Sequence, residues 1–168
     1  MYSVFEPRLT FKDKTAVFKT LMTNNISGTS PVVEEFEAKC ANKFDRKYGI
    51  AVSNGSVALD LALQLLDLKE GDEVIIPSFT IISCLSAVIR TKAKPVFCDV
   101  DNLTWNMSFE NVQEKITDKT KAIVVVHTYG LVCDVEKIKE HRIDKEIKII
   151  EDTAEAHGQH LNDTKCGT

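Results

Sequence analysis

Five short apolar runs, rich in β-branched residues, recur along this chain, and segments with helical periodicity separate them. Most of the runs are unbroken rather than alternating in polarity, which is typical of parallel strands whose two faces are both covered. Strand and helix in repeated alternation predict an α/β fold built on a mostly parallel, doubly wound sheet. The predicted strands are Ile50–Val52, Glu73–Ile76, Pro95–Val100, Ala122–Val126 and Glu146–Ile150.

The segments between the strands carry helix signals. Ser30 followed by Pro31 is a favourable helix start, and an apolar stripe then predicts a helix that ends near Gly49. From Ser56 to Leu68 the polar residues share one narrow face, so this helix is predicted to be largely buried. Further helices are predicted at Phe11–Met22, Ile81–Arg90, Phe109–Ile116 and Asp134–Glu140.

Charge and composition exclude several classes of protein. The 168 residues include 21 basic and 25 acidic side chains without a basic cluster, so neither nucleic acid nor an anionic membrane surface is an expected partner. No run approaches the roughly 20 apolar residues of a membrane-spanning helix. The segment from Met1 to Arg8 lacks the apolar stretch of a signal peptide. We therefore expect a soluble protein of the cytoplasm.

Metal and disulfide chemistry find little support in the sequence. The five cysteines are widely spread and include no C-x-x-C pair, which favours reduced thiols over a zinc or disulfide role. His157 and His160 stand three residues apart, but no carboxylate or thiol at a familiar spacing completes a metal site with them. We expect no bound metal ion.

Polar and small residues follow the ends of all five predicted strands. Ligands of a doubly wound sheet bind beyond the carboxyl ends of its strands, so the chemistry is expected along this one edge. The segments that follow the strands, in chain order, are Ser53-Asn54-Gly55-Ser56, Pro77-Ser78-Phe79-Thr80, Asp99 to Asp101, His127-Thr128-Tyr129-Gly130 and Glu151-Asp152.

The segment from Ser53 to Ser56 has two interpretations. A glycine at the start of a helix lets backbone N–H groups approach a phosphate, and the helix dipole favours the negative charge. The segment is also consistent with a tight turn in which Ser56 is the N-cap of the helix. The chain has neither a G-x-G-x-x-G nor a G-x-x-x-x-G-K-[ST] motif, which argues against a dinucleotide or a nucleoside triphosphate as the ligand.

The charged residues at this edge also leave alternatives open. Asp152 either faces a charged ligand or caps a following helix, with Glu155 at the third helical position. Asp99 and Asp101 either bind a divalent cation or stabilise a solvated turn. His127 is expected to form a hydrogen bond at the end of its strand.

Taken together and in order, these segments resemble the DegT/StrS family of pyridoxal 5'-phosphate-dependent sugar aminotransferases, which have the fold type I of aspartate aminotransferase. The resemblance runs from about Gly28 to Gly167. Several spaced motifs in one order are more specific than any single motif. The matching motifs are Glu34 to Glu37, Val52 to Ser56, Gly71 to Thr80, Ala93 to Asp101, Thr120 to Ile123, Val126 to Gly130 and Glu151 to Gly158.

The resemblance implies roles for particular residues. Gly55, Ser56 and the backbone N–H of Val57 would hold the phosphate of pyridoxal 5'-phosphate. Asp152 would pair with the protonated pyridine nitrogen, where a carboxylate stabilises the positive charge through a charge-assisted hydrogen bond. Glu155 would lie near the ring oxygen of the cofactor.

Two departures from the family stand out. Ile81 lies where relatives often place an aromatic residue that stacks on the cofactor, so stacking there would be weaker. The Schiff-base lysine of relatives lies farther beyond the aspartate than the 16 residues that follow Asp152 here, and Lys165 falls too early to match it. Asp152 is therefore the one residue that we assign to catalysis, and no nucleophile is assigned.

We expect this chain to be an N-terminal fragment. Residues 1–30 would form an arm and a helix, and residues 31–168 an incomplete cofactor-binding large domain without the lysine region and the C-terminal small domain. In the family's sheet, strands from beyond the lysine lie beside the first strand. The strand predicted at Ile50–Val52 would therefore lack its neighbour.

Three functions stay open. The leading hypothesis is the N-terminal part of an enzyme that moves an amino group from an amino acid, glutamate in first place, to a nucleotide-linked keto sugar. Otherwise the chain would be an inactive truncated relative that serves as a binding or regulatory module, or a relative of sugar dehydratases in which histidine replaces the lysine. By resemblance, the complete enzyme is a homodimer with its sites at the subunit boundary.

Overall fold

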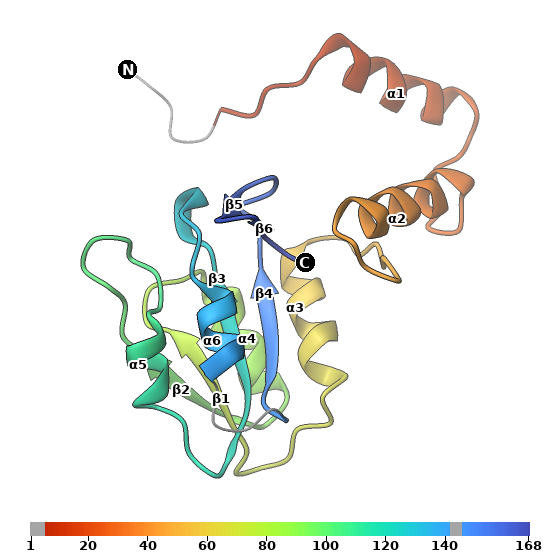
Figure 1. The fold of residues 1–168 in the computed structure, drawn as a ribbon. Coiled ribbons are helices and arrows are strands. Elements are labelled where there is room, and N and C mark those ends of the chain that lie inside the picture. The colour runs from red at the N-terminus through yellow and green to blue at the C-terminus, as the bar shows by residue number, and fades with distance from the viewer. Residues whose placement is uncertain (1–5, 142–145) are drawn as a thin grey trace. The chain divides into compact units, whose positions relative to one another are not determined.

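The computed structural model describes residues 6–141 and 146–168, and the chain divides into two compact units, Met1–Ala51 and Val52–Thr168 (Figure 1). The first unit contains the helices α1 (Phe11–Met22) and α2 (Pro31–Lys43). The helices of the second unit are α3 (Gly55–Gln64), α4 (Ile82–Arg90), α5 (Phe109–Gln113), the short 3-10 helix η1 (Thr128–Gly130) and α6 (Val135–His141). Its strands are β1 (Glu73–Pro77), β2 (Lys94–Cys98), β3 (Thr120–Val126), β4 (Lys148–Asp152), β5 (His160–Leu161) and β6 (Thr164–Lys165).

The two helices of the first unit lie where the sequence predicts them. α1 starts with a capping box, because the Thr10 hydroxyl accepts a hydrogen bond from the Asp13 amide while the Asp13 carboxylate accepts one from the Thr10 amide. α2 ends at Lys43 rather than near Gly49 as predicted. Asp45 adopts a left-handed conformation (φ 50°), which a right-handed helix cannot continue through.

The second unit is built on a parallel four-stranded sheet with the strand order β2-β1-β3-β4. Ile75 of β1 pairs with Val96 of β2 on one side and with Ile123 of β3 on the other, and Ile123 pairs with Ile149 of β4. β1 is buried along its whole length and β3 is buried except at one residue. The predicted α/β fold with a mostly parallel sheet is confirmed, and its central strands have the continuous apolar sequence that burial of both faces requires.

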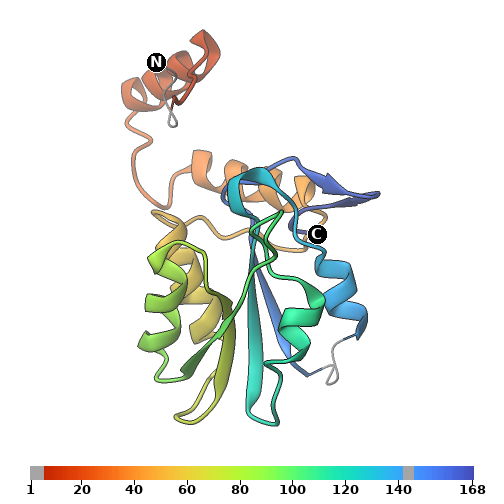
Figure 2. The ribbon, with the colours of Figure 1, turned by 90° about the vertical axis from the view of Figure 1, so that its left-hand side faces the viewer.

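Helices cover both faces of this sheet, α3 and α4 on one face and α5 and α6 on the other (Figure 2). Val124 of β3 belongs to the same buried cluster as Leu63 of α3 and Val88 of α4. Its neighbour Val125 belongs to the opposite cluster, with Ile138 of α6. Successive side chains of a strand point to opposite faces, so each central strand contributes to both layers of the core.

The same alternation determines which face of the sheet each side chain at the end of β4 lies on. Ile150 packs against the cluster on the α3 side, and Ile149 packs against the cluster on the α6 side. Asp152 therefore lies on the α3 face and Glu151 on the α6 face of the sheet.

The strand predicted at Ile50–Val52 is wrong. This segment forms no ladder with any described residue, and its Ala51 amide donates a hydrogen bond to the Glu37 carboxylate (2.7 Å) instead. Ile50 is 69% exposed. An apolar sequence becomes a strand only when a neighbouring strand satisfies its backbone groups, and the described part of the chain offers none at this place.

Several predicted boundaries shift by a few residues. α3 begins at Gly55 and ends at Gln64 rather than at Leu68, since the chain turns at Asp67, which has a positive φ of 48°. Val100 lies outside β2 and forms an isolated bridge with Met107. Among the helices of residues 6–141 and 146–168, none has the length and apolar character needed to cross a membrane.

Candidate active site

The amino end of α3 and the carboxyl end of β4 border one hollow of the second unit, with a volume of about 290 Å³. In a parallel sheet this is the edge at which ligands bind. The helix contributes only small and apolar residues to the lining, whereas the acidic and polar residues of the lining all come from the strand and the turn after it. The lining residues are Gly55, Ala58, Leu59, Ala62, Ile150, Glu151, Asp152, Thr153, Ala154 and His157.

Asp152 is the last residue of β4, and the ladder with β3 extends to it. Its backbone carbonyl accepts a hydrogen bond from the His127 amide (3.2 Å), and its carboxylate accepts one from the Ala154 amide (3.1 Å). Of the two alternatives for Asp152, the helix cap with Glu155 is wrong, because turns and the short β5–β6 hairpin follow β4. The carboxylate is instead half-buried at the border of the hollow.

The start of α3 is capped by Asn54. Its side-chain oxygen accepts a hydrogen bond from the Val57 amide (3.1 Å), and Gly55 and Ser56 are the first two residues of the helix. The interpretation of Ser56 as the N-cap is therefore wrong. Its hydroxyl forms a hydrogen bond of 2.7 Å with the hydroxyl of Ser83 on α4.

This helix end has the properties of an anion cradle. Among the described residues, no acceptor pairs with the amides of Gly55 and Ser56, and both amides carry the positive end of the helix dipole. A Cβ atom placed on Gly55 would meet no atom within 4 Å. Packing within the protein thus does not require a glycine here, and its missing side chain leaves room beside the hollow.

The other predicted site residues lie outside the lining of the hollow. The Glu155 carboxylate accepts a hydrogen bond from the Tyr129 amide (2.6 Å) and so ties the turn after β4 to the turn after β3. Tyr129 has a positive φ of 53°, which makes this contact part of a strained turn. Ile81 is the N-cap residue of α4 and is 61% exposed. Ser56 and Val57 lie at the helix end itself.

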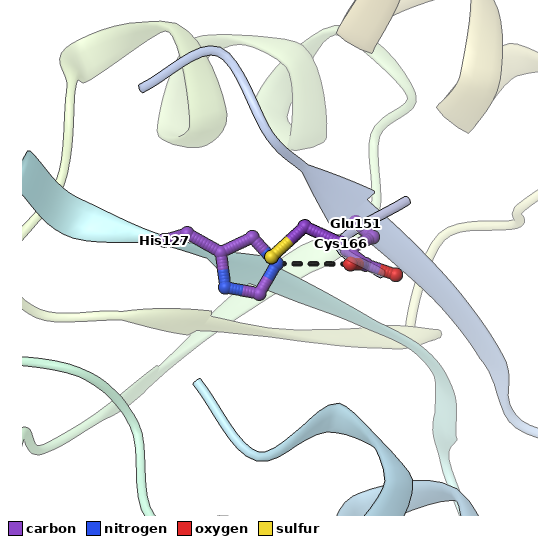
Figure 3. Close-up of side chains that lie close together, drawn as sticks. All are labelled: His127, Glu151 and Cys166. Carbon is purple, nitrogen blue, oxygen red and sulfur yellow. Dashed lines mark hydrogen bonds and ion pairs between the residues drawn. The ribbon is translucent and has the colours of Figure 1, made fainter. Parts of the chain in front are cut away.

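A second cluster of functional groups lies on the opposite face of the sheet, formed by His127, Glu151 and Cys166 (Figure 3). The imidazole of His127 is fully buried and its Nε2 lies 3.0 Å from Glu151 Oε1. Burial alone raises the pKa of Glu151, but hydrogen bonds from the His127 ring and the Gly167 amide (2.6 Å) outweigh it and leave the pKa below its ordinary value. The predicted hydrogen bond of His127 is confirmed.

Hydrogen bonding rather than metal binding explains this cluster. Its three potential ligand atoms lie within 4.8 Å of one another, as a metal site would require. However, Nδ1 of His127 accepts a hydrogen bond from the Cys133 amide (3.0 Å), so the ring proton sits on Nε2, which points at Glu151. A protonated nitrogen cannot ligate a metal ion, and burial raises the pKa of the Cys166 thiol.

Asp99 and Asp101 serve the turn after β2. One carboxylate oxygen of Asp101 accepts hydrogen bonds from the amides of Leu103 and Thr104 and from the Thr104 hydroxyl, and these bonds lower the pKa of Asp101. Asp99 accepts a hydrogen bond from the Val100 amide (2.9 Å). Of the two alternatives, the solvated turn describes these residues.

Known proteins match this chain over nearly its whole length. The model of the DegT/DnrJ/EryC1/StrS aminotransferase family matches residues 8–168. GDP-perosamine synthase of Escherichia coli O157:H7 is 44% identical over 165 residues, which are 98% of this chain and 45% of that protein. dTDP-3-amino-3,6-dideoxy-alpha-D-galactopyranose transaminase of Aneurinibacillus thermoaerophilus is 43% identical over 136 residues, or 81% of this chain and 38% of that protein.

Solved structures agree with these sequence matches. The aminotransferase from Psychrobacter cryohalolentis has a TM-score of 0.88 at 40% identity, covering 95% of this chain and 40% of that one. GDP-4-keto-6-deoxy-D-mannose-3-dehydratase of E. coli, with bound hydrated PLP, has a TM-score of 0.91 at 27% identity, covering all of this chain and 44% of that one. The chain thus spans less than half the length of the relatives that it matches.

Proposed function

Because the chain belongs to the DegT/DnrJ/EryC1/StrS aminotransferase family, we propose that it forms the N-terminal part of an enzyme that transfers an amino group from an amino acid to a nucleotide-linked keto sugar. The family depends on pyridoxal 5'-phosphate, and the relatives named above include nucleotide-sugar aminotransferases. The division into an arm of residues 1–30 and an incomplete large domain of residues 31–168 is part of the same proposal.

The observation that carries the proposal is the shared border of one hollow. Gly55 lies at the positive end of α3 and Asp152 at the end of β4, and both line the hollow. A ligand that spans it would meet amide donors at one place and a carboxylate at another. Pyridoxal 5'-phosphate has the matching groups, an anionic phosphate and a ring nitrogen that can be protonated.

Each end of the hollow has a separate task in the proposed reaction. When bound, the cofactor supplies a conjugated ring that accepts the electrons released as a substrate Cα–H bond breaks. The Asp152 carboxylate would hold a proton on the ring nitrogen, because the negative charge stabilises the cationic form through a charge-assisted hydrogen bond. The amides of Gly55 and Ser56 would hold the phosphate at the positive end of the helix dipole.

The Val57 amide is less available to a phosphate than the family resemblance implies. The Val57 amide already donates to Asn54. A phosphate would therefore share that donor with the Asn54 side chain or rely on the amides of Gly55 and Ser56. Glu155 would reach the cofactor's ring oxygen only by giving up or sharing its bond to the Tyr129 amide.

Substrates, assembly and location complete the proposal. The amino donor is glutamate and the acceptor is a keto sugar linked to a nucleotide, in keeping with the sugar nucleotides named in the relatives. The complete protein acts as a homodimer in the cytoplasm. No helix among residues 6–141 and 146–168 is suited to a membrane, which is consistent with that location.

A second candidate function is sugar dehydration. Its basis is the fold shared with GDP-4-keto-6-deoxy-D-mannose-3-dehydratase (TM-score 0.91), although the aminotransferase TlmJ from Streptoalloteichus hindustanus has the same TM-score. Sequence identity favours the aminotransferase, at 44% to GDP-perosamine synthase against 27% to the dehydratase. The residue at the Schiff-base position distinguishes the two, since the aminotransferase requires a lysine and the dehydratase a histidine.

One assay separates the candidates. The complete gene product would be incubated with pyridoxal 5'-phosphate, glutamate and GDP-4-keto-6-deoxy-D-mannose, and the sugar product identified by mass spectrometry. We expect an amino sugar together with 2-oxoglutarate. A deoxy sugar that retains its keto group would establish the dehydratase, and an unchanged sugar nucleotide across a panel of nucleotide-linked keto sugars would refute both.

A further inference from the structure

The imidazole of His127 joins three segments of the chain behind the hollow. Its Nδ1 accepts a hydrogen bond from the Cys133 amide (3.0 Å), and its Nε2 lies 3.0 Å from the Glu151 carboxylate. Glu151 in turn accepts a hydrogen bond from the Gly167 amide (2.6 Å). One buried ring therefore connects the end of β3, the segment after η1 and the end of β4. Figure 3 shows its contact with Glu151.

The same residue also contacts Asp152 through its backbone. The His127 amide donates to the Asp152 carbonyl (3.2 Å), which is the last bond of the β3–β4 ladder. The His127 ring thus contacts Glu151, whose side chain lies on the α6 face. The His127 amide contacts Asp152, whose side chain lies on the α3 face. Two consecutive residues of β4 are thus held by His127, the residue that follows β3.

We propose that His127 is a positioning residue that acts through Glu151 to hold the Asp152 carboxylate in the geometry that the reaction requires. The proposal rests on the proposed function of Asp152. A strand end is free to fray where its ladder stops, and β4 meets turns directly after Asp152. The hydrogen bond from the buried ring to the neighbouring carboxylate opposes this fraying, because breaking it would leave the buried Nε2–H of His127 without an acceptor.

The chemistry of the ring indicates which substitutions separate its two contacts. In the neutral ring Nδ1 is the acceptor and Nε2–H is the donor. In glutamine the amide nitrogen stands as many bonds from Cα as Nε2 does, so His127→Gln keeps the donor toward Glu151. In asparagine the oxygen stands as many bonds from Cα as Nδ1 does, so His127→Asn keeps the acceptor for Cys133 but cannot reach Glu151.

The test is a double-mutant cycle in the complete holoenzyme, with turnover measured at saturating cofactor. We expect His127→Asn to lower kcat about tenfold while leaving KM within about twofold, because a misplaced catalytic group lowers turnover rather than substrate binding. His127→Gln is expected to keep kcat within about twofold of the unmodified enzyme. In an Asp152→Asn background, His127→Asn is expected to lower kcat no further.

Two results would overturn this role of His127. The first is an equal fold-loss of kcat from His127→Asn in both backgrounds, which would show that its effect does not pass through Asp152. The second is an equal loss in the Gln and Asn variants at an unchanged melting temperature, which would show that the bond to Glu151 does not matter. If instead Asp152→Asn alone left kcat unchanged, the proposed function of Asp152 would fail first and this inference with it.

A spectroscopic measurement tests the arrangement without any assay of activity. The ¹⁵N chemical shifts of the His127 ring in the unmodified protein are expected to show a protonated Nε2 and an unprotonated Nδ1, because Nδ1 accepts the hydrogen bond from the Cys133 amide. Amide hydrogen exchange at Gly167 is expected to accelerate in His127→Asn and to stay slow in His127→Gln. The opposite tautomer, or equal exchange in both variants, would contradict the proposal even where His127→Asn proves too unstable for kinetics.

Discussion

Asp152 and Glu151 are consecutive carboxylates with opposite surroundings. The Asp152 side chain borders the open hollow beside α3, where a ligand can reach it. The Glu151 side chain is 11% exposed and receives hydrogen bonds from His127 and Gly167. The pleat of β4 separates the two charges onto different faces, so one is available for chemistry while the other holds the structure behind it.

Replacing Asp152 by asparagine tests its proposed role. In the complete enzyme we expect Asp152→Asn to lower kcat by about a hundredfold or more, because a neutral amide stabilises the protonated ring nitrogen less than a carboxylate does. The affinity for pyridoxal 5'-phosphate should change far less, since the phosphate contacts at α3 remain. Steady-state kinetics and cofactor titration measure both quantities, and equal turnover in the two proteins would remove this role of Asp152.

The lowered pKa of Glu151 should make the stability of the protein depend on pH. Its pKa lies below the ordinary value of 4.5 in the folded protein, so its stabilising contribution is fully present above that pH and is lost as the pH falls through the folded pKa. Glu151→Gln keeps an oxygen acceptor but cannot ionise. In urea titrations the difference in unfolding free energy between the two proteins should therefore stay constant above the ordinary pKa of 4.5 and shrink as the pH falls below it. A difference that does not change with pH would show that the charge of Glu151 does not contribute.

Individual residues differ in how far their surroundings can be predicted. The hydrogen bond of His127 follows from a polar residue at the end of an apolar run. Its partner Glu151 does not, because the pairing depends on the register that sets Val125 opposite Glu151. Ser56 was a plausible N-cap by residue type, but Asn54 is as good a cap and leaves Gly55 and Ser56 inside the helix.

At the scale of elements, α3 combines a structural cap with the proposed phosphate site. Asn54 stabilises the helix by accepting from the Val57 amide, and the two amides before Val57 point toward the same end. The helix also supplies Leu59 and Leu63 to the core beside β4. The start of α3 is thereby fixed relative to the sheet edge that carries Asp152.

Two substitutions of Asn54 separate the cap from the charge at this helix end. Asn54→Ala should lower the free energy of unfolding by about 1 kcal/mol in urea titrations, because the Val57 amide loses its acceptor. Asn54→Asp keeps an acceptor, so its stability should match that of the unmodified protein. Its added negative charge should weaken pyridoxal 5'-phosphate binding in a fluorescence titration. Unchanged cofactor affinity in Asn54→Asp would place the phosphate elsewhere.

The strands show where sequence patterns succeed and fail. The four apolar runs that pair with one another were predicted, and in the central strands β1 and β3 burial on both faces accounts for the unbroken apolar sequence. Ile50–Val52 has the same character but no partner among the described residues. The composition of a segment indicates whether it suits a strand. Whether it pairs depends on segments distant in sequence, and a local pattern contains no information about them.

At the scale of the whole molecule, the two units expose large apolar side chains. Phe11 is 82% exposed in the first unit and Leu103 is 88% exposed in the second. No residue of α1 or α2 is buried. Apolar exposure on this scale is typical of surfaces that other protein segments cover. The length of the chain, less than half that of the relatives named above, is consistent with this.

The exposed surface leads to a prediction about the 168-residue chain expressed by itself. We expect it to bind the dye ANS and to self-associate in light-scattering measurements, because its apolar side chains lack the cover of a larger protein. The complete gene product serves as the control and should bind ANS weakly at equal concentration. A monomeric 168-residue chain that binds no ANS would show that the units need no further cover.

In the proposed site, Asp152 faces the ring nitrogen of pyridoxal 5'-phosphate while the amino end of α3 holds its phosphate. The most direct test is a crystal structure of the complete gene product with the cofactor bound. We predict an oxygen of Asp152 within about 2.9 Å of the ring nitrogen, the distance of a charge-assisted hydrogen bond, and the phosphate against the amides of Gly55 and Ser56. A bound cofactor whose ring nitrogen points away from Asp152 would contradict the role proposed for this carboxylate.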